Sequence, residues 1–119
     1  MSVHPLTPGD GPTVERPKRT LAALKEALAQ VAPSQLPVME AERDEVFTLA
    51  AETQSVGPVN GFLFRWATVV EIERHPEVAR RLHRAEQAVR MAGDEETMRA
   101  AIQEVAEIQA AARRAVEGG

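Results

Sequence analysis

The sequence predicts an all-α fold: a single domain built as a bundle of about five helices, preceded by a flexible N-terminal arm. Two observations lead to this class. Apolar side chains recur at spacings of three or four residues along most of the chain, and proline or glycine interrupts them at short intervals. Aromatic residues make up only 3% of the 119 residues, so the core must be filled by aliphatic side chains, most of which suit helices.

The N-terminal segment differs in composition from the rest of the chain. Residues 1–17 hold four prolines, two glycines and few apolar side chains, so this stretch is a poor core former. We expect residues 1–17 to form a flexible arm that contributes nothing to the fold. Residues 18–119 are expected to form the helical domain.

The first two helices are predicted from apolar spacing and from the positions of proline. In residues 20–31, leucine and valine stand three or four residues apart, and Pro33 ends the helix because the residue before a proline avoids helical angles. Ser34 is the candidate N-cap of a second helix over residues 36–54. Residues 55–61 contain two glycines and a proline, and we expect them to form the next loop.

Residues 62–72 are expected to form the central helix of the bundle. Eight of these eleven residues are apolar, and a helix that is apolar nearly all round is normally enclosed by other helices. The polar positions Arg65, Thr68 and Glu71 do not alternate with a period of two, which argues against a β-strand. Trp66 is expected to be a buried structural anchor.

Two further helices are predicted after the central one. Pro76 stands at the first position of a helix over residues 76–91, and Gly93 is its expected end. Asp94 is a good N-cap for the last helix. That helix has a long apolar stripe, with alanines beside it that would let another helix approach; the stripe consists of Met98, Ile102, Val105, Ile108 and Val116.

Several classes of function are disfavoured by what the sequence lacks. It contains no cysteine, which excludes disulfides and thiolate metal sites, and we expect a cytoplasmic protein. No apolar run approaches the roughly 20 residues of a membrane-spanning helix. Glu71 and His75 stand four residues apart but are too few ligands for a metal site. Because no phosphate loop, dinucleotide fingerprint or nucleophile motif occurs, we expect no cofactor and no enzymatic activity.

Two surfaces are candidates for binding a partner. Arg80, Arg81 and Arg84 form the main basic cluster, which is either a solvated face paired with glutamates or a site for an acidic protein or nucleic acid. The stripe of the last helix runs for about five turns, which is long for the flank of so small a domain. It either binds between chains or packs inside the monomer. The partner-binding residues predicted in this stripe are Ile102, Val105 and Ile108.

The order of the segments LPVMEAERDEVFTLAAETQSV and FLFRWATVVEIERHPEVARRLHRAE, followed by a closing helix rich in alanine and glutamate, resembles a family of small actinobacterial all-helical proteins. The signature is an F-L-x-R-W run within a pattern of helices, and the resemblance covers residues 20–117. It implies a small cytoplasmic helical protein with an antitoxin-like accessory role. It implies no catalytic or binding residues.

The sequence as a whole favours a non-enzymatic protein-interaction module, such as the antitoxin or regulatory subunit of a two-protein system. Its partner would be another protein or a second copy of the chain. The net charge of −4 supports this choice over a nucleic-acid-binding protein. The alternative is a sequence-specific DNA-binding regulator that uses the basic helix over residues 76–91.

Overall fold

The computed structural model describes residues 11–119, and these residues form five α-helices and one short 3₁₀ helix, η1. No β-strand occurs among them, which confirms the predicted all-α class. Residues 1–10 of the predicted arm lie outside the described residues. The helices are α1 (Leu21–Val31), η1 (Pro33–Gln35), α2 (Leu36–Thr53), α3 (Gly57–Glu73), α4 (Pro76–Met91) and α5 (Glu95–Gly118).

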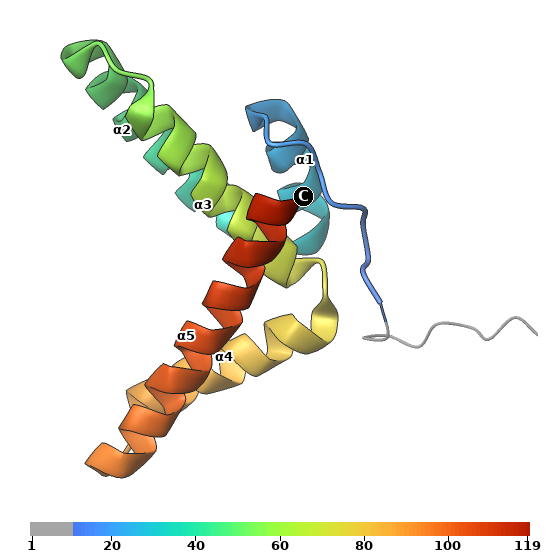
Figure 1. Cartoon of the computed structure of the whole chain (residues 1–119), viewed down its shortest axis with the longest axis vertical. Coiled ribbons are helices and arrows are strands. Elements are labelled where there is room, and N and C mark those ends of the chain that lie inside the picture. Colours follow the sequence, from blue (N-terminus) through green and yellow to red (C-terminus); the bar gives the residue numbers. More distant parts are fainter. Residues whose placement is uncertain (1–10) are drawn as a thin grey trace, which may run out of the picture.

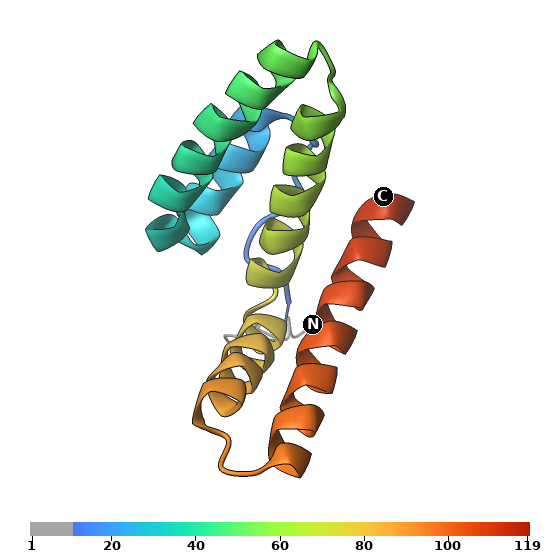
Figure 2. The same ribbon diagram turned by 90° about the vertical axis from the view of Figure 1, so that its left-hand side faces the viewer.

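The helices form two hairpins that diverge from one corner (Figure 1, Figure 2). α2 packs along α3 in the first hairpin, α4 packs along α5 in the second, and the corner lies between α3 and α4. α1 packs on α3, and the C-terminal half of α5 returns to α3. Within the described chain, α3 is therefore the helix that contacts all four others.

The central position of α3 follows from its sequence. Phe62, Trp66 and Val70 stand four residues apart and are buried, and they pack against leucines of α1 and a methionine of α2. The prediction of a buried Trp66 is confirmed, because its side chain is 4% exposed. Its indole N–H donates to Glu42 Oε1 over 2.6 Å, so the polar part of the ring also has a partner.

Two predicted boundaries are wrong. Ser34 is not an N-cap, because it lies within η1 and α2 begins after Gln35, which makes no side-chain cap bond. The predicted loop over residues 55–61 is mostly helix, since α3 already begins at Gly57. A proline in the first turn of a helix lacks only an amide hydrogen that has no partner there, so it does not break α3. The chain reverses instead at Gln54, which adopts the left-handed conformation (φ 52°) after α2.

The predicted starts of α4 and α5 are confirmed. Pro76 occupies the first turn of α4, and Asp94 is the N-cap of α5. The Asp94 side chain accepts a hydrogen bond from the backbone N–H of Thr97 at 2.7 Å. Hydrogen bonds from the backbone and then the side chain of Thr97 lower the pKa of Asp94. The cap is therefore ionised at neutral pH, where it stabilises the positive end of the α5 dipole.

The second hairpin has a core of its own. Small side chains bring α4 and α5 close together, and the buried cluster consists of Ile72, Ala79, Leu82, Ile108 and Ala112. Farther from the corner, the buried side chains between α4 and α5 are Ala85 and Ala101. No third helix covers this far end of the hairpin in the described chain (Figure 2).

The predicted stripe of α5 is divided between the core and the surface. Ile108 and Val116 are buried, whereas Met98 and Ile102 are exposed. The reason is that α5 packs on α4 through Ala101, which lies to one side of the stripe, so the first half of the stripe turns outward. The predicted close approach of another helix to the alanines beside the stripe occurs at Ala101, where that helix is α4 of the same chain.

We predict that Trp66→Ala lowers the free energy of unfolding by about 3–5 kcal/mol, as the loss of a large buried aromatic side chain generally does. Chemical denaturation followed by circular dichroism measures this change. Phe47→Ala is the control, because the Phe47 side chain is 46% exposed, and it should change stability by less than about 1 kcal/mol. Equal losses in the two variants would contradict an anchoring role for Trp66.

Candidate interaction groove

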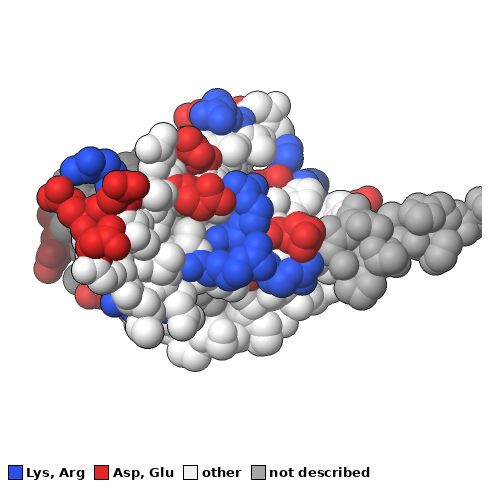
Figure 3. All heavy atoms as spheres, turned by 90° about the horizontal axis from the view of Figure 1, so that it is seen from below, with Lys and Arg blue, Asp and Glu red and all other residues white. Residues whose placement is uncertain are grey.

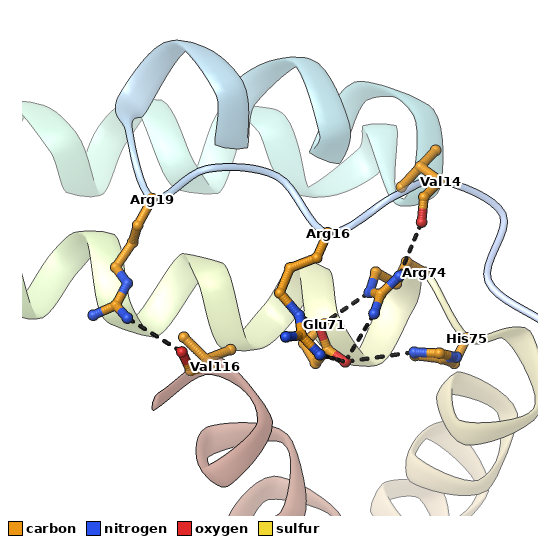
Figure 4. A network of polar contacts seen from close by, with 7 residues as sticks. All are labelled: Val14, Arg16, Arg19, Glu71, Arg74, His75 and Val116. Atoms are coloured by element: carbon orange, nitrogen blue, oxygen red, sulfur yellow. Dashed lines mark hydrogen bonds and ion pairs between the residues drawn. The ribbon is translucent and has the colours of Figure 1, made fainter. Parts of the chain in front are cut away.

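A buried carboxylate holds the corner between the two hairpins. Glu71, in the last turn of α3, is 6% exposed. Arg16 donates from Nε to Oε1 at 2.8 Å and from Nη2 to Oε2 at 3.2 Å. Arg74, directly after α3, donates in the same way at 3.0 and 3.3 Å (Figure 4). One carboxylate therefore joins two guanidinium groups that lie far apart in the sequence.

Residues 11–19 run along α3 without helical structure, and we name them the strap (Figure 4). Near its start, the Val14 carbonyl accepts a hydrogen bond from Arg74 Nη1 at 3.1 Å. Near its end, Arg19 Nη2 donates to the Val116 carbonyl in the last turns of α5 at 3.2 Å. The strap therefore connects the corner with the C-terminal end of α5.

These contacts correct the expectation that residues 1–17 contribute nothing to the fold. In the described part of that segment, the Thr13 N–H donates to the Arg74 carbonyl at 2.8 Å, and Arg16 forms the bidentate pair with Glu71. Composition misleads here because the strap needs no apolar side chains to bind. Backbone hydrogen bonds and a charge-assisted pair attach it instead.

The surroundings of Glu71 determine its ionisation. Burial raises the pKa of Glu71, but the hydrogen bonds from Arg16 and Arg74 outweigh it, so the pKa lies below its ordinary value. His75 Nε2 lies 3.4 Å from Oε2, beside a carboxylate that already accepts four hydrogen bonds. Glu71 is therefore an ionised structural anchor and is poorly placed to act as a free acid or base.

Because the corner sets α4 and α5 at an angle to α3, a groove opens along one face of the three helices. Its more enclosed hollow, which we name the main hollow, has a volume of about 460 Å³. Phe64, Val69 and Ile72 of α3 and Leu82 of α4 supply the apolar part of its lining. Polar and charged side chains supply much of the rest: Gln35, Arg65, Thr68, Glu73, His83, Glu86, Gln109 and Arg113.

The groove continues between α4 and α5. A second, shallower hollow shares Glu86 and Gln109 with the first, and its apolar lining includes Val89, Ile102 and Val105. Ile102 is 51% exposed, although it is a large aliphatic residue. Exposed apolar side chains that line a groove with a charged rim are typical of a protein-binding surface.

Some charged side chains of the groove are already paired. His83 Nε2 lies 2.9 Å from Glu73 Oε2, and Arg65 Nη2 lies 2.6 Å from Glu42 Oε1. Arg113 forms no ion pair with any residue between 11 and 119. Arg113 therefore offers a cation without an ion-pair partner among the described residues, at the end of the groove that α5 shares with α3.

The structure separates the apolar residues predicted to bind a partner. Ile102 and Val105 line the groove. Ile108 does not, because it is buried in the core of the second hairpin. Ile108 is 4% exposed, so it offers little surface to a partner in this conformation.

The three arginines predicted as a basic cluster lie on another face of α4. Arg80, Arg81 and Arg84 are all exposed. Arg80 pairs with Glu77, and Arg81 Nη2 lies 2.8 Å from Glu104 Oε2 on α5. Seen from below, Lys and Arg side chains gather in one patch with acidic side chains directly beside it (Figure 3). The cluster of Arg80, Arg81 and Arg84 is therefore partly neutralised by the glutamates that pair with Arg80 and Arg81.

Sequence patterns do not indicate most of the other groove residues. Phe64 and Val69 have the pattern of core positions, and His83 and Arg113 have that of solvated surface. These side chains line one hollow because the corner brings three helices together, and no local spacing encodes that angle.

No group of three or more His, Asp or Glu side chains in residues 11–119 is placed to hold a metal ion. No helix in that range combines the length and the apolar character needed to cross a membrane. Comparison with protein-family models, curated proteins and solved structures finds no match to the chain. The resemblance to the actinobacterial family therefore stays a prediction.

We predict that Glu71→Gln lowers the free energy of unfolding by about 3–5 kcal/mol, because it leaves two guanidinium groups without their anion. The loss should shrink in acid. A carboxylate whose pKa is lower in the folded chain stabilises the fold above its unfolded pKa, about 4.3, and this contribution disappears as the pH falls through the folded value. Urea denaturation of wild type and variant at pH 7 and at lower pH measures both effects.

The control for this prediction is Glu77→Gln, which removes the partner of Arg80 from an exposed pair. It should change stability at pH 7 by less than about 1 kcal/mol. A Glu71→Gln variant as stable as this control would show that the carboxylate does not hold the corner. A loss that stays constant into acid would contradict the lowered pKa.

We predict that deletion of residues 1–17 lowers the free energy of unfolding by about 1.5–3 kcal/mol, the usual contribution of hydrogen bonds to charged groups. The deletion removes Arg16 and the backbone partners of Arg74. Thermal unfolding by calorimetry measures the change. A chain that lacks only residues 1–10 keeps all these contacts and is the control. Identical melting temperatures for the two shortened chains would show that the strap adds no stability.

Proposed function

We propose that this chain is a non-enzymatic protein-interaction module, such as the regulatory or antitoxin subunit of a two-protein system, and that it binds its partner in the groove. The observation that carries the proposal is the half-exposed Ile102 side chain in a groove that leads into the main hollow. Covering such surface stabilises a complex by roughly 25 cal/mol for each Å² of apolar area removed from water.

A helix fits this groove better than a small molecule does. The lining comes from α3, α4 and α5, and it extends from the corner toward the far end of the second hairpin. An amphipathic helix laid along it would direct apolar side chains toward Ile102 and Val105 at intervals of three or four residues. A small-molecule site, in contrast, normally encloses most of its ligand.

The charged rim of the groove supports selectivity. Glu86 and Arg90 flank the apolar lining on α4, and Arg113 stands at the other end on α5. Charges around an apolar interface favour partners with the opposite pattern and disfavour partners with the same pattern. A partner helix for this groove would therefore carry an acidic residue near Arg113.

Sequence-specific DNA binding through α4 is the second proposal. It is favoured by the exposure of Arg80, Arg81 and Arg84 on one side of the helix. It has less support than the groove because Arg80 and Arg81 already pair with glutamates. Affinity for DNA depends on cations that are free to neutralise phosphates.

We predict that Ile102→Glu removes the chain from its complexes, because a carboxylate in the groove would lose its water on binding without gaining a partner. Val38→Glu introduces the same charge at an exposed apolar position of α2 outside the groove and should leave the complexes intact. Size-exclusion chromatography of a lysate of the source cells, followed by mass spectrometry of the fractions, measures the complexes. Both variants should keep wild-type helix content, since both positions are exposed.

Two outcomes would contradict the proposed function. In one, the wild-type chain elutes as a monomer with no protein bound. In the other, the complexes persist in Ile102→Glu. A gel-retardation signal that is lost in Arg84→Gln and retained in Ile102→Glu would transfer the support to DNA binding.

A further inference from the structure

The exposed side of α5 carries opposite charges at its two ends. Glu95 in the first turn and Arg113 five turns later point the same way, because eighteen residues complete five turns of an α-helix. Met98, Ile102 and Ala106 lie between them on that side, and all five residues are exposed. This face therefore has an acidic end, an apolar middle and a basic end.

The two charged ends are unable to neutralise each other within one chain. Eighteen residues of helix span about 27 Å, which is far beyond the reach of an ion pair. Among the described residues, Glu95 pairs with Arg99 over 3.4 Å, and the Glu95 side chain is still 89% exposed. Arg113 has no ion pair there at all. Both side chains are therefore accessible to a partner.

We propose that the partner in the groove is a second copy of this chain, with the two α5 helices packed antiparallel across a twofold axis. This inference rests on the proposed function and names the partner that it requires. Antiparallel pairing places the acidic end of each α5 at the basic end of the other. In the register that sets Glu95 of each copy opposite Arg113 of the other, Ile102 of each copy lies opposite Ala106 of the other.

The register satisfies shape and charge together. The large Ile102 side chain meets the small Ala106, and twofold symmetry repeats every contact. A parallel arrangement would instead bring Glu95 against Glu95 and Arg113 against Arg113, which like-charge repulsion disfavours. The pattern of α5 is therefore complementary to itself in the antiparallel direction only.

The same arrangement occupies the groove. Arg113 and Gln109 line its main hollow, and Ile102 and Ala106 line the second. A second α5 that lies along these residues therefore passes through both hollows. It also covers the far end of the second hairpin, where α4 and α5 have no third helix, and completes a layer of four helices.

Reversal of the two charges tests the pairing. We predict that Glu95→Arg and Arg113→Glu each weaken dimerisation of the full chain by about tenfold or more, because each places like charges at both symmetric contacts. The double variant E95R/R113E restores opposite charges and should return to within about threefold of wild type. Sedimentation equilibrium at low salt, from about 10 µM to about 500 µM protein, measures the dissociation constants.

Matched controls lie one residue along the helix. Glu96→Arg and Arg114→Glu make the same charge changes on another side of α5, and both positions are exposed. They should alter the dissociation constant by less than about threefold. Glu96→Arg also controls for the lost acidic side chain in the first turn of α5.

A wild-type chain that stays monomeric throughout this range would overturn the inference, and so would a double variant as weak as the single ones. The experiment distinguishes a failure of this inference from a failure of the proposed function. A monomeric wild type whose complexes with a different protein are lost in Ile102→Glu would refute the second copy and keep the groove as a binding site. A dimer that Ile102→Glu and the single charge reversals abolish, and that the double variant restores, supports both.

Discussion

The arrangement of the helices depends on the buried carboxylate of Glu71 between the guanidinium groups of Arg16 and Arg74. Moving charged groups out of water costs several kcal/mol for each ion, so such a cluster persists only where every group is paired. Here each carboxylate oxygen accepts two hydrogen bonds, and Arg74 also donates to the strap. The end of α3, the turn into α4 and the strap are therefore stabilised as one unit.

The angle set at this corner decides which apolar surface is covered. α3 is too apolar for α1 and α2 alone to bury it, and α5 returns to cover it with Val116. The second hairpin then projects away from the first, so its far end keeps Ile102 in contact with water. The groove therefore lies between α3, which is apolar nearly all round, and the second hairpin, which covers only part of the α3 surface.

Local spacing was sufficient to predict the central helix, the burial of Trp66 and the Asp94 cap, because each depends on residues within a few turns. The start of α3 was not predictable, since a glycine and a proline suit a loop and a first helical turn equally well. The bond between Arg16 and Glu71 joins residues 55 positions apart. No periodicity reports such a pair, and the strap's composition points to disorder instead. The apolar stripe of the last helix indicated Ile102 and Val105 as candidate binding residues, and both line the groove. The α3 side of the groove was not predictable, because it forms only through the angle between the two hairpins.

The two halves of α5 differ in how they are buried, and this difference argues that the exposed face of its N-terminal half binds another protein surface. The C-terminal half buries Ile108 and Val116 in the chain's own cores. Among the described helices, α4 is the one that lies along the N-terminal half (Figure 2), and a helix in that position is stable with polar residues on its open side. It carries Met98 and Ile102 there instead, and charges of opposite sign lie at the two ends of the same face. A solvated helix face needs no acidic end, apolar middle and basic end, whereas a helix that pairs antiparallel with its own copy requires this arrangement.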